Sequence, residues 1–110
     1  MHSNQQKLAA SLRRSYDSIV CGSGSSGSVV ARRLAENPDV NVLLLEAGGT
    51  DDVPNVMRAN QWPRNFGTER DWSFQAQPSP YVNGRAIPLH MGKVLGGGSS
   101  INADGLVAWA

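Results

Sequence analysis

The feature that most constrains this chain is a glycine-rich stretch, Gly22–Gly27 (GSGSSG), which lies between two different hydrophobic patterns. Before it, Tyr16–Cys21 contains adjacent β-branched residues, which favour a short buried strand. After it, apolar residues recur at helical spacing from Ser25 up to Asn37-Pro38, where proline disfavours a helical residue before it. The pattern predicts a strand, a tight turn and a helix in that order.

A second strand is expected at Val40–Leu45, because its almost unbroken apolar run suits a parallel strand covered on both faces. Glu46 follows it directly, about 20 residues beyond the glycine turn. Strand, G-x-G-x-x-G turn, helix, strand and acidic residue together form the fingerprint of a Rossmann-type, FAD/NAD(P)-binding βαβ unit. We therefore predict an α/β fold that is incomplete, the N-terminal part of a larger doubly wound domain.

Each residue of the fingerprint has its own physical role. Gly22 permits the tight turn, Gly24 lets the backbone approach a pyrophosphate, and Gly27 lets the helix pack close to the strand. The helix N-terminus offers unpaired N–H groups and partial positive charge to phosphates. Glu46 is expected to accept hydrogen bonds from both hydroxyls of an adenosine ribose, and its charge disfavours the 2′-phosphate of NADP. This pattern does not distinguish FAD from NAD, and a purely structural glycine turn with a solvated Glu46 is the alternative.

Composition narrows the class of protein. The 110 residues allow one modest domain, and 10 Lys+Arg against 9 Asp+Glu provide no basic stripe for nucleic acid. One cysteine cannot form an internal disulfide, and no run approaches the roughly 18 apolar residues of a membrane span. Residues 1–15 are expected to form a polar leader, a tail in preference to a short helix with Leu8, Ala9 and Leu12 on one side. The expected location is cytoplasmic, with no nucleic-acid partner and no membrane span.

The stretch from Thr50 to Met91 is rich in proline and shows no sustained period. Loops beyond about 12–15 residues are uncommon in compact domains, so we expect either an excursion over a ligand or material that packs against a partner. The Gly96–Ser100 cluster that follows repeats the phosphate-cradle pattern, and a flexible linker is the alternative. Ser99 or Ser100 is the expected N-cap of a helix that begins there.

The other reactive side chains receive structural interpretations. His90 has no second ligand at metal spacing and is expected to be a surface or loop residue. Cys21 is expected to be a small buried residue at a strand end, and the Asp51-Asp52 pair to be solvated. No metal site is predicted.

Two segments resemble the N-terminal part of the glucose-methanol-choline oxidoreductases, which are FAD-dependent alcohol oxidases and dehydrogenases. They are Asp17–Gly48 (DSIVCGSGSSGSVVARRLAENPDVNVLLLEAG) and Gly92–Asn102 (GKVLGGGSSIN). Glu69–Phe74 and Asn83–Arg85 also resemble that family, so the similarity covers residues 16–102. The resemblance implies that residues 16–110 are the N-terminal part of an FAD-binding domain, and it favours FAD over NAD.

The resemblance also implies where the cofactor is held. The first glycine turn would meet the pyrophosphate, Glu46 and the adjoining residue the ribose, Trp72 the adenine end, and the second glycine cluster the flavin. Ile101 stands where some members attach flavin through a histidine, so that bond is excluded here. The implied cofactor-binding residues are Gly22, Gly24, Ser25, Ser26, Gly27, Glu46, Ala47, Trp72, Val94, Gly97, Gly98, Ser99 and Asn102.

After Asn102 the chain departs from the family pattern. The run Ala103–Leu106, with Trp109 displaced, replaces bulky apolar residues and an aromatic residue. Asp104 is unfavourable beside a flavin that becomes anionic on reduction, because like charges disfavour that state. The departure concerns the flavin-side contacts and leaves the ADP-side contacts unaffected.

The resemblance implies a flavoprotein that oxidises the CH–OH group of a small-molecule alcohol, with hydride transfer to FAD, giving an aldehyde or ketone. The histidine base of the family lies in its C-terminal half, so we predict no catalytic residue in this chain and assign the activity to a longer parent protein. A non-catalytic nucleotide-binding fragment or remnant, and an NAD-binding Rossmann module, are the alternatives.

Overall fold

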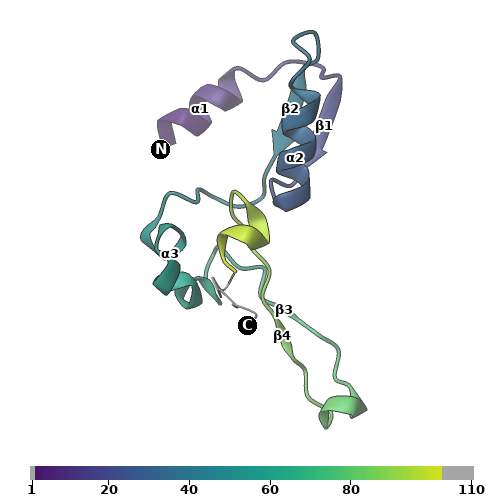
Figure 1. Cartoon of the computed structure of the whole chain (residues 1–110), viewed down its shortest axis with the longest axis vertical. Coiled ribbons are helices and arrows are strands. Elements are labelled where there is room, and N and C mark those ends of the chain that lie inside the picture. Colours follow the sequence, from purple (N-terminus) through teal and green to yellow (C-terminus); the bar gives the residue numbers. More distant parts are fainter. Residues whose placement is uncertain (1, 103–110) are drawn as a thin grey trace, which may run out of the picture.

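The computed structural model describes residues 2–102, with side chains from residue 6 onward. A parallel βαβ unit stands at one end of the molecule, and a long hairpin extends from the other (Figure 1). The unit consists of β1 (Ser18–Cys21), α2 (Ser25–Leu34) and β2 (Val42–Leu45). Ser18 pairs with Val42 and Cys21 with Leu45 in a parallel register. The predicted Rossmann-type βαβ unit is therefore confirmed.

The expectation that these strands are buried is wrong within residues 2–102. Ile19 is 59% exposed and Leu45 is 47% exposed, and Cys21, expected to be buried, is exposed. Helix α2 packs on β1 and β2, but it is a single helix on a two-stranded sheet. A sheet of two strands lacks the neighbours that would cover its second face and its edges, which is why its apolar side chains stay accessible.

Residues 2–10, where a tail was favoured over a short helix, form helix α1 (His2–Ala10). Leu8 is 60% exposed, and a cavity of about 600 Å³ lies between this helix and β2. A hydrogen bond from Arg13 to the Asn41 side chain joins the segment after α1 to the turn before β2. The helix thus lies beside the sheet without closing onto it.

The proline-rich middle of the chain is folded into short elements. Helix α3 (Pro54–Met57) and the 3-10 helix η1 (Ala59–Asn65) pack on each other. The strands β3 (Phe74–Gln75) and β4 (Pro88–Leu89) pair in an antiparallel hairpin, with η2 (Pro80–Val82) near its tip. These elements are too short to produce a sequence period, which is why the sequence shows none.

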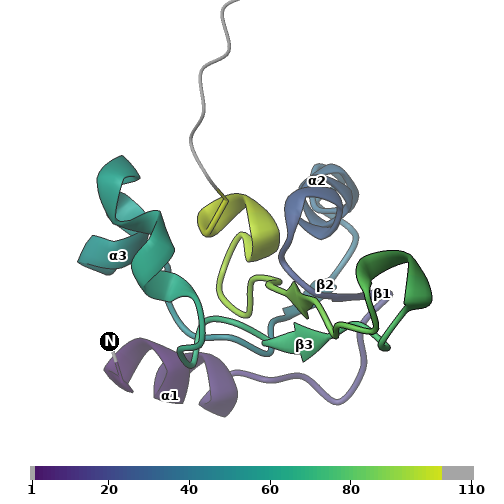
Figure 2. The same ribbon diagram turned by 90° about the horizontal axis from the view of Figure 1, so that it is seen from below.

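The second glycine cluster forms the 3-10 helix η3 (Gly97–Ser100), which lies between α3 and α2 in both ribbon views (Figure 2). Its N-cap is Gly96, so the expected cap at Ser99 or Ser100 is wrong for this helix. Both serine hydroxyls instead donate to carbonyls of the preceding turn, each over 2.6 Å. Residues 103–110, where the sequence departs from the family pattern, lie outside the described residues.

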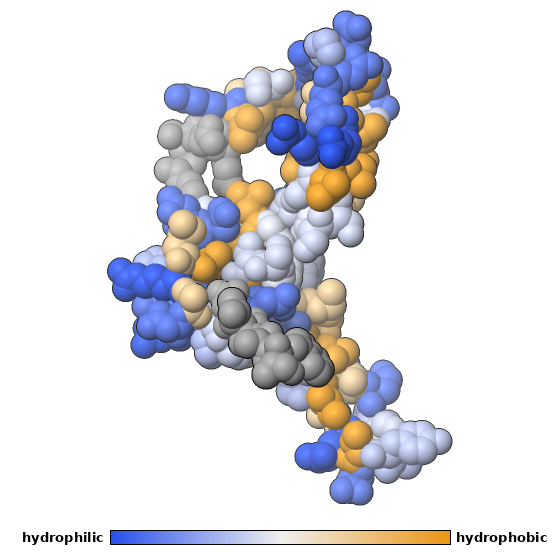
Figure 3. Space-filling model, in the orientation of Figure 1, coloured by the Kyte–Doolittle hydropathy of each residue, from blue (hydrophilic) through white to orange (hydrophobic). Residues whose placement is uncertain are grey.

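The buried apolar core of residues 2–102 is small and consists of two residues that flank η3 in sequence and one residue of α2. Val94 is 0% exposed, Ile101 is 2% exposed and Ala31 is 8% exposed. Many large apolar side chains are accessible instead, along the hairpin arm and beside α2 (Figure 3). No helix within this part of the chain combines the length and the apolar character that crossing a bilayer requires.

Candidate cofactor site

The first glycine turn joins β1 to α2 in the way the fingerprint requires. Gly22 has φ +91°, which side chains rarely adopt, and its N–H donates to the Leu45 carbonyl over 2.7 Å. A Cβ at Gly27 would lie 1.9 Å from the Gly22 carbonyl oxygen, so only glycine permits this approach of helix to turn. A Cβ at Gly24 meets nothing within 4 Å, so this glycine faces open space.

The second glycine cluster packs directly on the first turn. A Cβ on Gly97 would lie 2.9 Å from the Gly24 Cα, and η3 contacts the start of α2. The segment before η3 also pairs with the stretch that follows β2, because Val94 forms a parallel bridge with Gly49 and Leu95 N–H donates to the Gly49 carbonyl over 3.0 Å. The two glycine-rich segments, far apart in sequence, thus form one surface.

Ser23 connects these segments, a role that sequence analysis missed. The residue is 2% exposed, and its hydroxyl donates to Glu46 Oε2 over 2.7 Å while accepting from the Gly96 N–H over 3.2 Å. Its backbone N–H donates to the same Glu46 oxygen over 2.8 Å. Ser23 occupies a variable position of the G-x-G-x-x-G pattern, so no local signal marked it.

Glu46 lies at the end of β2, as predicted, and its carboxylate already accepts hydrogen bonds from within the chain. Besides the two bonds from Ser23, its Oε1 accepts from the Gly48 N–H over 2.8 Å. Burial raises the pKa of this carboxyl, but the hydrogen bonds from Ser23 and Gly48 outweigh it and hold the pKa below its ordinary value. A carboxylate offers about four acceptor sites, so about one remains, and the expected pair of bonds from both ribose hydroxyls exceeds this capacity.

A cavity of about 560 Å³ opens between the two glycine segments and the base of the hairpin. It brings together predicted cofactor residues from four distant stretches of sequence, and it adds four residues that were not predicted to contact the cofactor. The predicted members are Gly22, Gly24, Glu46, Ala47, Trp72, Gly97 and Gly98. The added members are Cys21, Leu45, Met91 and Gly92.

The remaining predicted cofactor residues do not line this cavity. Ser25 and Ser26 are exposed in the first turn of α2. Val94 has no exposed surface at all and serves as core. Ser99 and Asn102 are exposed but lie away from the cavity lining, and Gly27 is used in helix packing.

Trp72 forms one wall of the cavity and is 43% exposed. The Lys93 ammonium lies 4.8 Å from the centre of its ring, a cation–π contact. The Phe74 ring is nearly parallel to it, with centroids 5.8 Å apart. The contacts with Lys93 and Phe74 therefore hold the Trp72 ring in one orientation along the cavity.

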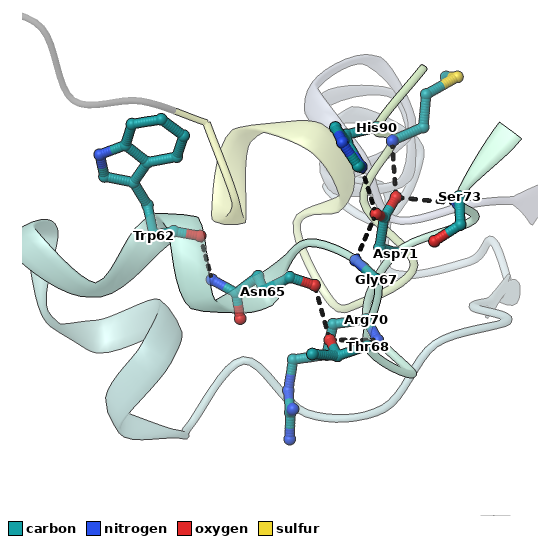
Figure 4. Close-up of polar contacts among 9 residues, drawn as sticks. Trp62, Asn65, Gly67, Thr68, Arg70, Asp71, Ser73 and His90 are labelled. Atoms are coloured by element: carbon teal, nitrogen blue, oxygen red, sulfur yellow. Dashed lines mark hydrogen bonds and ion pairs between the residues drawn. The ribbon is translucent and has the colours of Figure 1, made fainter. Parts of the chain in front are cut away.

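The residue before Trp72, Asp71, is a buried aspartate that sequence analysis also missed, and Figure 4 shows its hydrogen-bond partners. The Asp71 side chain is 0% exposed and accepts from the backbone N–H groups of Gly67, Ser73 and Met91 and from His90 Nδ1. Burial raises its pKa, but these four donors outweigh it and hold the pKa far below its ordinary value. Asp71 is thus a stable buried anion.

His90 is exposed and lies outside the helices and strands, as predicted, but it also contacts two partners. Its Nδ1 lies 2.6 Å from Asp71 Oδ2, and its ring stacks on Phe66 with centroids 4.1 Å apart and planes 8° apart. Its side chain is 35% exposed. The partners stand about 20 residues away in sequence, so no short-range spacing could reveal them.

The residues present fit a dinucleotide. A methyl group at Gly24 or Gly98 would project into open space where a ligand backbone can approach. The N-cap of α2, Gly24, provides no side-chain cap, so the first N–H groups of this helix stay available to phosphate oxygens. A carboxylate with a spare acceptor site and an aromatic surface complete the features suited to ribose and adenine.

Comparison with known proteins supports this picture. The chain is 48% identical over 92 residues to oxygen-dependent choline dehydrogenase 1 of Chromohalobacter salexigens, and 46% identical over 92 residues to oxygen-dependent choline dehydrogenase of Burkholderia thailandensis. It superposes on the crystal structure of pyridoxine 4-oxidase from Mesorbium loti with a TM-score of 0.77 and 36% identity, over 84% of this chain and 18% of that one. The chain matches the N-terminal portion of the glucose-methanol-choline oxidoreductases.

A further solved structure is also similar to this chain. A fungal aryl-alcohol oxidase superposes with a TM-score of 0.62 and 32% identity, over 83% of this chain and 15% of that one. The matches to the two choline dehydrogenases cover 81% of this chain but only 16% of each relative's length. No family model matches the chain.

Proposed function

We propose that this chain is the FAD-binding portion of a flavoprotein oxidoreductase that acts on the CH–OH group of alcohols. The observation that carries the proposal is the closure of one cavity by both glycine segments, tied together through Ser23 and Glu46. The names of its relatives, choline dehydrogenases and an aryl-alcohol oxidase, support an alcohol as the substrate class. Because the chain spans only 16% of the length of each choline dehydrogenase, the whole activity is proposed for a longer protein, and the cytoplasmic location stays a prediction.

Within this chain, the proposed roles are binding and orientation. The first turn of α2 would hold the pyrophosphate, and Glu46 would accept one hydrogen bond from the ribose. Its charge would also repel a 2′-phosphate, which disfavours NADP. Bound FAD supplies the electron acceptor for alcohol oxidation. The residues of this chain would fix its ADP half and would shield one side of it from water.

The single cysteine of the chain offers a direct test. Cys21 is exposed and lines the cavity, so a bound dinucleotide should cover it. We expect saturating FAD to slow maleimide labelling of Cys21 about tenfold or more, and NAD to slow it less. Equal labelling rates with and without FAD would contradict the proposal, and stronger protection by NAD would indicate an NAD-binding module.

Two glutamates give a matched pair of variants for the same assay. Glu46→Gln removes the charge and places an amide where Ser23 and Gly48 donate, so FAD affinity should fall about tenfold. Glu36→Gln removes the same charge in the exposed turn that follows α2, where the carboxylate pairs with Arg32 and Arg33, and should leave affinity unchanged. Equal effects of the two variants would show that Glu46 has no special place in the site.

A further inference from the structure

Asp71 lies where two backbone segments, residues 67–73 and 90–92, meet next to the cavity-lining Trp72 and Met91. Its Oδ1 accepts from Ser73 N–H over 2.9 Å and from Met91 N–H over 3.0 Å. Its Oδ2 accepts from Gly67 N–H over 2.9 Å and from His90 Nδ1 over 2.6 Å. These four bonds use all the acceptor sites of a carboxylate, so none is left for a ligand.

The same segments carry the wall of the cavity. Trp72 N–H donates to the Met91 carbonyl over 2.9 Å, and Asp71 forms an antiparallel bridge with Gly92. Trp72, Met91 and Gly92 all line the cavity. Asp71 is not among the cavity-lining residues, and its carboxylate therefore fastens together the two segments that bring these residues to the cavity.

We propose that Asp71, together with His90, is a positioning residue that holds the Trp72–Met91 wall of the cavity in place for the cofactor. The role of this wall in binding FAD rests on the function proposed above. The fastening of the wall itself does not, because it follows from hydrogen bonds within the chain.

His90 contributes two separable contacts. Its Nδ1 faces Asp71, and its ring stacks on Phe66, which in turn meets the Trp62 ring edge-on at 5.4 Å between centroids. Trp62 belongs to η1, so these rings connect His90 to the α3–η1 segment. Substitutions at His90 can remove one contact and keep the other.

The first experiment measures the solvent accessibility of Trp72 in the absence of a cofactor. Trp62→Phe and Trp109→Phe in the full chain leave Trp72 as the single tryptophan, whose quenching by acrylamide reports its accessibility. Asp71→Asn places an amide against four donors, and we expect the quenching constant of Trp72 to rise. Asp39→Asn, the same change at an exposed turn, is the control and should leave quenching unchanged. Unchanged quenching in Asp71→Asn would overturn the proposal.

Substitutions at His90 keep the test decisive where Asp71→Asn fails to fold. His90→Asn keeps a donor near the Nδ1 position and loses the ring, whereas His90→Phe keeps the stacked ring and loses the donor. We expect His90→Phe to raise Trp72 quenching and His90→Asn to stay near the parent value. The reverse order would show that stacking on Phe66, and not the bond to Asp71, holds the wall.

The second experiment separates positioning from general stability. Asp71→Asn should weaken FAD binding about tenfold in the parent chain but less than about twofold in a Trp72→Ala background, because its effect passes through that wall. Equal losses in both backgrounds would indicate a merely structural role and overturn the proposal. A parent chain that binds no FAD would refute the proposed function, while the quenching measurements would still decide whether Asp71 holds the wall.

Discussion

Gly24 and Gly27 stand three residues apart and differ in what an added methyl group would meet. At Gly27 the methyl would lie 1.9 Å from the backbone oxygen of Gly22, which cannot move aside cheaply. Gly27→Ala should therefore destabilise the fold by about 1–3 kcal/mol, which is a fall in Tm of about 4–8 °C per kcal/mol. Thermal unfolding followed by circular dichroism measures this.

Gly24→Ala is the matched control for that measurement. The methyl meets nothing within 4 Å, and φ is −66°, which alanine adopts readily. Its Tm should stay within about 2 °C of the parent, since no packing mechanism is involved, while FAD affinity should fall because the methyl occupies the ligand's path. A variant that lost stability but kept affinity would contradict our division of roles between the two glycines.

Two buried or half-buried carboxyls make stability depend on pH. The pKa values of Asp71 and Glu46 are both lowered in the folded chain, so the unfolded state binds more protons in acid. Their contribution is complete above the unfolded values near pH 4 and is lost as pH falls through and below them. Urea unfolding at pH 7, 4.5 and 3 should show this decline, and Asp71→Asn should make it shallower. If the unfolding free energy of Asp71→Asn fell with the same slope as that of the parent, Asp71 would be excluded as a cause of the pH dependence.

At the scale of single residues, the sequence predicts those whose role is local and misses those whose partners are distant in sequence. Gly22, Gly24 and Gly27 act through backbone shape, which the motif records directly. Ser23 bonds to Glu46 and Gly96, and Asp71 bonds to His90 and Met91, all about 20 or more residues away, so no short pattern contains these contacts. The expected burial of Cys21 was wrong because burial depends on neighbouring elements and not on the strand itself.

At the scale of elements, η3 and the start of α2 behave as one unit. Gly97 has φ +59°, and a Cβ there would lie 2.9 Å from the Gly24 Cα, so Gly97→Ala should push the two glycine segments apart. We expect a loss of about 1–3 kcal/mol in stability together with weaker FAD binding. Gly98→Ala, whose methyl meets nothing within 4 Å, should keep the Tm. Equal Tm values for both variants would contradict close packing of the two segments.

The βαβ unit was predictable because its helix has a clear hydrophobic period and its strands have β-branched or unbroken apolar runs on either side of the glycine turn. The hairpin and the 3-10 helices were not, since strands of two residues and helices of three to seven residues produce no period. The N-cap expected at Ser99 or Ser100 failed for a related reason. Serine hydroxyls bond equally well to preceding carbonyls, and the tertiary contact of Gly97 with Gly24 determines where η3 begins.

At the scale of the whole molecule, the chain is more extended than its length requires. Its radius of gyration is 17.4 Å, whereas a compact domain of this length has about 13 Å. Large apolar residues such as Ile19, Leu44 and Leu89 are 59%, 39% and 49% exposed. Such surface is typical of a face that another part of a protein covers.

We therefore expect the 110-residue chain to bind the dye ANS and to associate as its concentration rises. Sedimentation velocity over a range of concentrations would measure the association. The double variant Ile19→Thr/Leu44→Thr places a polar, β-branched residue at both positions. It should reduce dye binding and association without loss of secondary structure. A monomer that binds no dye at any concentration would show that these side chains are covered in solution.

The hydrogen bond between Gly96 N–H and the Ser23 hydroxyl spans 73 positions of sequence, whereas β1 and β2 pair across about 24. A longer loop costs more entropy to close, so the βαβ unit can form while the second glycine segment is still unattached. On a ribosome, which adds about 5–20 residues each second, the first turn and Glu46 would emerge seconds before Gly96. We expect the cavity to be assembled last, and a nucleotide already held by the first turn would give the second segment a surface on which to close.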